Sequence, residues 1–164
     1  MRRRVLLPAA LLALAAAVAL LPQRAVVTVD AADGRRVAAA ALPASGGFAL
    51  RYRHSYYGAE AAEWFQAAPD GGFRLVAVGS PSQAVLDYYG LAGRVRRDGG
   101  WLRLELGEPQ GFRRLPVIAT GLGRRTLVVA AAATPLAAPG GGPAHLVIGV
   151  ERRPWLLDEV DRRL

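Results

Sequence analysis

The chain contains no cysteine and no lysine, and the two absences narrow what its 164 residues can do. Without cysteine there is no disulfide framework, no cysteine-ligated zinc and no thiol nucleophile. All 21 basic residues are arginines, in a chain rich in Ala, Gly and Pro. Because lysine is a good phosphate partner, selection for phosphate binding would not remove it. A general compositional bias explains the arginine usage better.

Histidine is scarce as well, and no recognisable cofactor motif is present. His54 and His145 are far apart and form no H-x-H or H-E-x-x-H spacing, so no metal site is predicted. The glycine run 140–142 lies between prolines and has no following Lys-Ser/Thr, so it is no phosphate loop. Despite a formal charge of +8, the arginines form no basic stripe. We expect no metal, cofactor or nucleic-acid partner.

The N-terminal segment has the pattern of an export signal. Arginines at 2–4 precede the uncharged apolar run 5–21. The small residues at 17–19 suit cleavage after Ala19, while the run also reaches the lower length limit of a spanning helix. We interpret residues 1–22 as a signal peptide or signal-anchor helix. The rest is then periplasmic or extracytoplasmic, and anchored in the inner membrane through residues 5–21 if the signal stays uncleaved.

Residues 25–153 predict one mainly β domain. Short β-branched or alternating segments recur between Gly, Pro and Asp turns, which is typical of a single antiparallel β-sandwich or partly open barrel. The expected strands are 25–30, 36–42, 48–56, 60–67, 73–78, 91–97, 101–106, 112–119, 126–132 and 145–151. Segment 80–90 is predicted as a short helical turn or a crossing loop, and 154–164 as a short amphipathic C-terminal helix. Residues 121–125 (GLGRR) are interpreted as a basic hairpin tip, with anion binding as the alternative.

The stretch 48–65 reads as a β-hairpin and holds most of the candidate chemistry. With a loop at 57–59, the predicted cross-strand pairs are Tyr56–Glu60, His54–Ala62, Tyr52–Trp64 and Arg53–Glu63. This register places an aromatic pair on one face and an ion pair on the other, each contributing roughly 0.2–1 kcal/mol. His54 then lies on the apolar face, where the hairpin turns.

Two interpretations of His54 follow from this position. A lone histidine on an apolar face is most simply a partly buried residue, bonded to a neighbouring carboxylate or to the backbone. Alternatively, His54, Ser55, Tyr57 and Glu60, together with Arg53, form a polar pocket at the strand ends. Such a pocket would hold a small anion or a side chain of a partner.

A catalytic role for His54 would require a carboxylate partner, for which Glu63 and Asp87 are the candidates. The chain would then be a small exported hydrolase or ligand-binding enzyme. No G-x-S-x-G elbow is present, however, and Ser80 and Ser82 lie in SPSQ instead. We therefore expect a protein without catalytic activity and keep the enzyme as the alternative.

The hairpin also resembles a known family. An aromatic-rich strand ending in Tyr-x-His-Ser is formed by Tyr52, His54 and Ser55, and the next strand carries Glu63 and Trp64. This pattern is similar to the mark of the domain of unknown function 1850 family. The family's members are small exported or membrane-anchored β proteins, encoded beside or fused to tripartite ATP-independent periplasmic (TRAP) transporters of the TAXI type.

The resemblance covers residues 25–153 and includes the strands at 73–76 and 145–151. Where members often carry a Gly-Ala-Gly-like segment, this chain reads SPSQAVLDYYG. The resemblance implies a non-catalytic accessory protein that binds the TRAP permease or its solute-binding protein. The binding residues expected on this basis are Tyr52, Arg53, His54, Ser55, Glu63 and Trp64.

Overall fold

The computed structural model describes residues 23–137 and 141–154, and in this part of the chain it contains eleven strands and one helix. The strands are β1 (Gln23–Ala31), β2 (Arg36–Ala41), β3 (Gly47–Arg53), β4 (Glu60–Ala67), β5 (Phe73–Ser80), β6 (Gly93–Asp98), β7 (Trp101–Phe112), β8 (Arg114–Ala119), β9 (Thr126–Val129), β10 (Ala132–Pro135) and β11 (Ala144–Pro154). The helix α2 (Gln83–Tyr89) lies between β5 and β6 along the chain.

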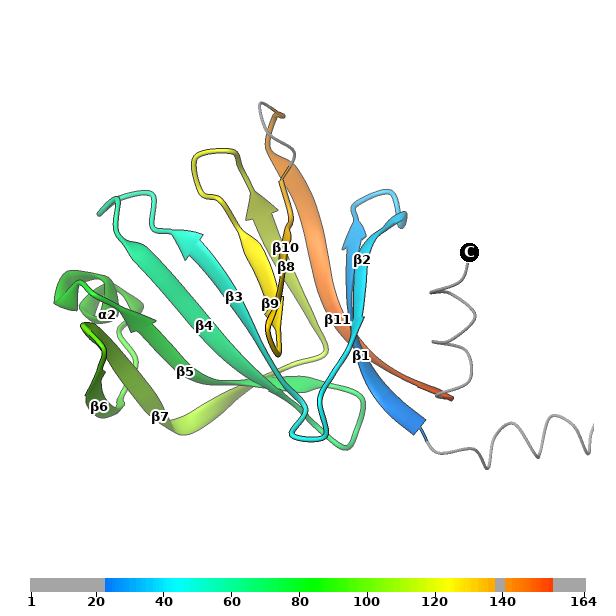
Figure 1. Cartoon of the computed structure of the whole chain (residues 1–164), viewed down its shortest axis with the longest axis horizontal. Helices are drawn as coiled ribbons and strands as arrows, with labels where there is room; N and C mark the ends of the chain where they lie inside the picture. The colour runs from blue at the N-terminus through cyan, green and yellow to red at the C-terminus, as the bar shows by residue number, and fades with distance from the viewer. Residues whose placement is uncertain (1–22, 138–140, 155–164) are drawn as a thin grey trace, which may run out of the picture. The chain divides into compact units, whose positions relative to one another are not determined.

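These strands form two antiparallel sheets (Figure 1). The large sheet has the order β10-β9-β3-β4-β5-β7-β6, and the small sheet has the order β2-β1-β11-β8. Val29 and Ile148 of the small sheet belong to the same buried cluster as Leu50 and Val78 of the large sheet. The two sheets therefore share one apolar core. The mainly β, antiparallel prediction is confirmed, and the separate sheets fit its sandwich form.

Several local signals lie where they were expected. The turn between β6 and β7 has Asp98 paired with Trp101, so Gly99 and Gly100 are its central residues. Both have positive φ, 52° and 85°, which a two-residue hairpin turn of this kind requires and glycine adopts without strain. Of the two alternatives predicted for 80–90, a short helical turn or a crossing loop, the structure has the helix: α2 spans Gln83–Tyr89 and buries Val85 and Leu86.

Other strand limits and partners differ from the prediction. β7 continues to Phe112, and β10 had not been predicted. Residues 120–125 are not a hairpin tip, because β8 pairs with β11 in the small sheet while β9 pairs with β3 and β10 in the large one. They form instead a segment that crosses between the sheets, here called the crossing segment. Turn residues indicate that the chain changes direction, but they do not determine which strands pair with each other.

The register of β3 and β4 also differs from the prediction. Arg53 pairs with Glu60 and Tyr52 with Ala61, so the connection spans residues 54–59 and not 57–59. The predicted pairs Tyr52–Trp64, Arg53–Glu63, His54–Ala62 and Tyr56–Glu60 are wrong. Because the shift is an odd number of residues, it turns β4 over. Phe65 now faces the core in place of Trp64, and it stacks on Phe48 with the ring centroids 5.1 Å apart.

Aromatic side chains explain why this register is preferred. The chain has four phenylalanines, and all of them meet in one cluster of ring contacts, Phe48, Phe65, Phe73 and Phe112. Burying one phenylalanine contributes about 1.5–3 kcal/mol. The cross-strand pairs of the predicted register contribute less than that, so burial of Phe65 decides the pairing.

The structure does not test the predictions made for the two ends of the chain. The predicted signal segment, 1–22, and residues 155–164 of the predicted terminal helix lie outside the described residues. Pro154, expected to open that helix, is instead the last residue of β11. Within 23–137 and 141–154, no helix has the length and apolar character needed to cross a membrane.

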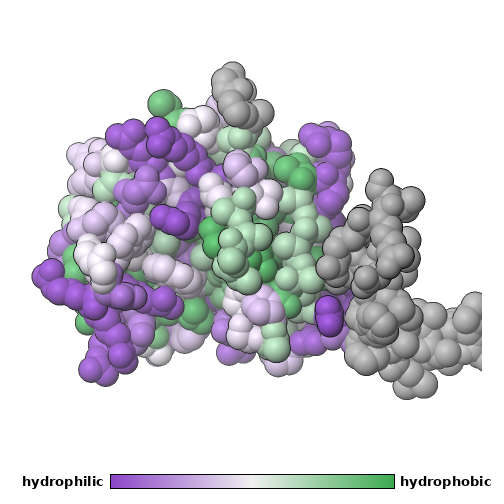
Figure 2. Space-filling view, viewed as in Figure 1, coloured by the Kyte–Doolittle hydropathy of each residue, from purple (hydrophilic) through white to green (hydrophobic). Residues whose placement is uncertain are grey.

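Figure 2 shows hydrophilic residues gathered over β6 and β7, and a more hydrophobic surface over the alanine-rich edge strands β2 and β10.

Candidate functional site

All five tyrosines of the chain gather where the β3–β4 hairpin turns. They are Tyr52 on β3, Tyr56 and Tyr57 in the connection, and Tyr88 and Tyr89 at the end of α2. The helix reaches the hairpin because its buried Val85 and Leu86 pack it beside β5 and β7. We call this region, with His54, the tyrosine end of the domain.

His54 stabilises the connection between β3 and β4. Its side chain is buried between two tyrosine rings, with centroid distances of 5.3 Å to Tyr57 and 4.8 Å to Tyr88. The Tyr57 backbone N–H donates to the His54 Nδ1 atom at 3.5 Å. The His54 backbone N–H donates to the Ala59 carbonyl at 2.8 Å, and the Gly58 N–H donates to the His54 carbonyl at 2.8 Å. The imidazole is thus bonded to the backbone, as the first interpretation of a partly buried histidine expects.

A second group of polar side chains, which is partly buried, is centred on Glu63. The Oε1 atom of Glu63 accepts hydrogen bonds from the hydroxyls of Tyr52, at 3.1 Å, and Tyr89, at 3.0 Å, and the two hydroxyls also contact each other. Arg125 Nη1 lies 4.0 Å from the Oε2 atom of Glu63, and its guanidinium stacks 4.5 Å above the Tyr52 ring. Burial, followed by the negative charge of Glu63, raises the pKa of both tyrosines. Both hydroxyls therefore remain protonated donors at neutral pH.

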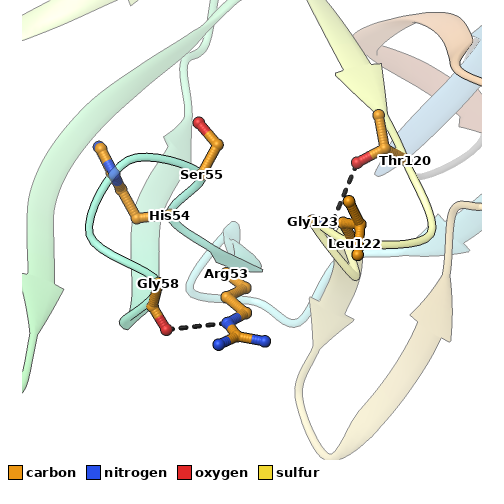
Figure 3. Close-up of a pocket in the computed structure, with 7 residues that line it drawn as sticks. All are labelled: Arg53, His54, Ser55, Gly58, Thr120, Leu122 and Gly123. Atoms are coloured by element: carbon orange, nitrogen blue, oxygen red, sulfur yellow. Dashed lines mark hydrogen bonds between the residues drawn. The ribbon is translucent and has the colours of Figure 1, made fainter.

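Arg53 joins the hairpin to the crossing segment. Its backbone N–H donates to the Gly123 carbonyl at 2.7 Å, and its Nε donates to the Gly58 carbonyl at 2.8 Å. Figure 3 shows the Arg53 side chain between the turn that carries Gly58 and the segment that carries Leu122 and Gly123. The β3–β4 connection of the large sheet and the crossing segment are therefore held side by side.

Two adjoining hollows lie between these segments, and Arg53, His54, Ser55, Thr120 and Gly123 line both of them. The first, of about 300 Å³, also includes Gly58 and Leu122 in its walls (Figure 3). The second, of about 330 Å³, also includes Tyr52, Tyr88, Ile118 and Arg125. We call the second one the arginine hollow, because both Arg53 and Arg125 line it.

Exposed apolar side chains surround the hollows. Tyr56 is 80% exposed, Leu122 87%, Tyr88 65% and Ile118 53%, and Tyr57 is partly exposed between Tyr56 and Tyr88. Tyrosine and arginine are enriched at the energetic centres of protein interfaces, because each offers a large contact area with polar groups. The tyrosine end therefore has the composition of a surface that binds another protein.

The structure brings together five of the six predicted binding residues. Tyr52, Arg53, His54 and Ser55 are neighbours at the tyrosine end, and Glu63 joins them through its hydrogen bond with Tyr52. Trp64 does not join them, since it lies on the opposite face of the sheet. There its ring covers Gly79 of β5, and the Arg103 guanidinium stacks on it at 4.2 Å.

Sequence reasoning missed the part of the site that comes from distant segments. Those residues are Tyr88 and Tyr89 from α2, and Thr120, Leu122 and Arg125 from the crossing segment and its end. Two signals pointed towards them: the adjacent tyrosines in SPSQAVLDYYG, and the GLGRR stretch with its anion-binding alternative. Neither signal indicates that these two segments meet the same hairpin.

The carboxylates considered as catalytic partners of His54 make other contacts. Glu63 accepts the two tyrosine hydroxyls, and Asp87 accepts a hydrogen bond from Gln83 Nε2 at 2.8 Å. In the described part of the chain, no carboxylate hydrogen-bonds the His54 ring. The residues that the structure describes also include no group of three or more His, Cys, Asp or Glu side chains that could hold a metal ion.

Comparison with known proteins finds no relative of this chain. No protein-family model matches the chain, and no curated protein or solved structure is significantly similar to it. The resemblance to the domain of unknown function 1850 family therefore depends on the residues quoted for it, and its functional consequences are proposals.

Proposed function

We propose that this chain is a non-catalytic accessory protein of a TAXI-type TRAP solute-uptake system. It acts on the periplasmic or extracytoplasmic side, where it binds the permease or the solute-binding protein through the tyrosine end. The observation that carries the proposal is the concentration of exposed Tyr56, Tyr88, Ile118 and Leu122 around Arg53. The link to TRAP transport comes from the resemblance of the hairpin.

The organisation of the tyrosine end supports binding. Beneath the exposed rim, the hydroxyls of Tyr52 and Tyr89 share Glu63, and His54 supports the turn that carries Tyr56 and Tyr57. A surface that is already ordered loses less conformational entropy when a partner binds. The buried contacts thus favour binding without taking part in it directly.

The enzyme alternative would need a carboxylate or a serine acting with His54. A general base must lie within hydrogen-bond reach of the group that it activates. The His54 ring accepts from a backbone N–H and is packed between Tyr57 and Tyr88. This arrangement supports the role of His54 in the turn, and we propose binding in preference to catalysis.

The test is a Tyr56→Ser/Leu122→Ser double variant. Both side chains are at least 80% exposed, so the variant should keep the thermal midpoint of the parent protein. Each interface anchor contributes about 1–2 kcal/mol. Capture of the permease or the solute-binding protein should therefore fall by about tenfold or more.

The matched control is Val37→Ser/Val95→Ser, which changes two exposed apolar residues on β2 and β6 and should leave capture unchanged. Full capture by the Tyr56→Ser/Leu122→Ser variant would contradict the proposed surface. Gene neighbourhood tests the proposed system separately, because consistent absence of TAXI-type permease genes beside this gene would rule it out.

A further inference from the structure

We propose that the arginine hollow is a carboxylate-binding site. Arg53 and Arg125 both line it, and none of its lining residues is an aspartate or a glutamate. The nearest carboxylate to Arg125 is that of Glu63, which does not line the hollow and whose Oε2 atom is 4.0 Å from Nη1. Because Glu63 Oε1 already accepts two tyrosine hydroxyls, its charge is shared with those donors. The hollow itself therefore presents positive charge.

Both guanidinium groups have donors available for a ligand. A guanidinium carries five N–H donors in a plane that matches a carboxylate. Arg53 uses Nε on the Gly58 carbonyl, which leaves its two terminal nitrogens. The Arg125 guanidinium donates no hydrogen bond within 3.5 Å to any residue in the described ranges; it lies 4.0 Å from Glu63 Oε2 and stacks on the Tyr52 ring.

Arg125 is held in place before any ligand arrives. Its side chain is only 18% exposed, and it is stacked 4.5 Å above the Tyr52 ring. A charged group that is partly shielded from water interacts more strongly with an anion than a fully solvated one does. Arg125 is therefore the stronger of the two proposed anchors, and the more exposed Arg53 closes the site from the hairpin side.

Hydroxyl groups and apolar walls complete the site. Thr120 Oγ1 accepts the Gly123 N–H at 2.9 Å, so its own hydrogen remains free to donate, and the Ser55 hydroxyl also lines the hollow. The rings of Tyr52 and Tyr88 and the side chain of Ile118 form the remaining walls. A volume of about 330 Å³ is at the small end of ligand pockets. The site therefore suits one carboxylate on a short carbon skeleton.

A carboxylate of this kind has two sources. It is either a free small organic acid or an aspartate, glutamate or C-terminal carboxylate of a protein partner. A carboxylate of a protein partner rests on the proposed function and would mean that the partner presents an acidic group. A free organic acid is independent of the proposed function. The experiment therefore includes a separate arm for each source.

The test follows the Arg Nε–H signals of the full chain by NMR during titration with succinate. A second titration uses a capped peptide whose only carboxylate is one glutamate side chain. Sodium chloride at equal ionic strength is the reference, since it reports non-specific screening. Saturable shifts of the Arg53 and Arg125 signals are expected with at least one of the two probes.

Arg125→Gln should weaken the binding by about tenfold or more, since hydrogen bonds to charged groups contribute about 1.5–3 kcal/mol. Because Arg125 also packs on Tyr52, Arg53→Gln is the second variant and should weaken binding without affecting that contact. The matched control is Arg114→Gln, an exposed arginine at the other end of β8, which should bind as the parent does.

Succinate binding alone assigns a free acid, and peptide binding alone assigns an acidic partner. No saturable shift beyond the chloride reference with either probe overturns the inference, as does equal binding by Arg53→Gln, Arg125→Gln and the control. Partner capture by these variants separates the two proposals. If capture persists while succinate binding is lost, the proposed function stands and the ligand is a free acid.

Discussion

At the scale of single residues, Glu63 is the polar group that organises the tyrosine end. It pairs across the sheet with Leu50 on one side and Val78 on the other, both fully buried. A carboxylate in such surroundings is costly unless hydrogen bonds compensate for the lost water. The hydroxyls of Tyr52 and Tyr89 provide that compensation. The same arrangement makes the ionisation of these tyrosines unfavourable.

The first prediction concerns stability at alkaline pH. Unfolded tyrosines ionise near pH 10, while burial and Glu63 raise the pKa of Tyr52 and Tyr89 in the folded protein. The contribution of the two tyrosines to the free energy of unfolding is fully present below about pH 10. It is lost as the pH rises above that value, because the tyrosines of the unfolded state release their protons first. The free energy of unfolding should therefore fall above about pH 10, and urea titrations from neutral to alkaline pH measure it.

The Tyr52→Phe/Tyr89→Phe variant provides the comparison. It should be less stable by roughly 1–3 kcal/mol at neutral pH, because Glu63 loses its donors, and its alkaline decline should be shallower. The chain has no lysine or cysteine, so no other side-chain type titrates in this range. Tyr56→Phe, at a residue that is 80% exposed, is the control. Parallel declines in the parent and the double variant would contradict the assignment.

At the scale of elements, β5 provides the surface on which Trp64 packs. A Cβ atom at Gly79 would lie 2.8 Å from the Trp64 ring and 3.0 Å from the Leu102 carbonyl oxygen. The tryptophan can therefore cover this part of the sheet only because residue 79 has no side chain. Arg103 stacks on the same ring, with its guanidinium 4.2 Å from the ring centroid. Three adjacent strands are thus linked by side chains on the face opposite the phenylalanine cluster.

The second prediction is that Gly79→Ala destabilises the protein. The added methyl group would overlap the Trp64 ring and approach the backbone of β7, and overpacking of this kind costs typically about 1–3 kcal/mol. Thermal and urea unfolding measure the loss. Gly111→Ala is the matched control on β7, because nothing lies within 4 Å of its added Cβ. Equal stability of the two variants would show that Trp64 does not pack closely on β5.

At the scale of the whole described fold, both sheets contribute to one core. Buried residues of β1 and β11, such as Val29 and Ile148, belong to the same cluster as residues of the large sheet, such as Leu50 and Leu104. Neither sheet buries its apolar face alone. Unfolding of one sheet would therefore expose the inner face of the other, and the two should unfold together.

The third prediction compares the two isoleucines of the chain. Ile148 is fully buried on β11, so Ile148→Ala should lower the free energy of unfolding by about 2–5 kcal/mol. Ile118, on the adjacent β8, is 53% exposed, and Ile118→Ala should cost much less. Far-UV circular dichroism and tryptophan fluorescence should report one coincident transition for Ile148→Ala. In a Trp155→Phe background the remaining tryptophans, Trp64 and Trp101, both lie on the large sheet, so a separate, later fluorescence transition would contradict the shared core.

Much of the local structure could be predicted from the sequence. Asp33-Gly34 and Gly99-Gly100 mark real hairpin turns, and segment 80–90 forms the short helix. The alternation from Phe48 to Tyr52 correctly indicates a strand, but β3 ends at Arg53 and Ala49 on its other face is buried as well. His54 lies where the hairpin turns, as predicted, and its backbone N–H and carbonyl are hydrogen-bonded within that turn. A binding role for His54 stays a prediction.

The β3–β4 register could not be obtained from the hairpin alone. Within the hairpin, pairing Tyr52 with Trp64 is favourable, but the energies of such pairs are small. The competing register buries Phe65 against Phe48 and Phe73, and Phe73 belongs to another strand. A prediction from the hairpin alone omits this larger contribution and therefore places Trp64 on the wrong face.

The sequence by itself determined most of the strands and several of the turns, because those preferences act over a few neighbouring residues. Only the tertiary structure decided which strands pair, and it alone brought Tyr89 and Arg125 to Glu63. Segments far apart along the chain meet when the free energy gained by burying them together exceeds the free energy of the local conformations that each would otherwise prefer. The tyrosine end and the arginine hollow depend on such meetings, so neither is visible in a single stretch of sequence.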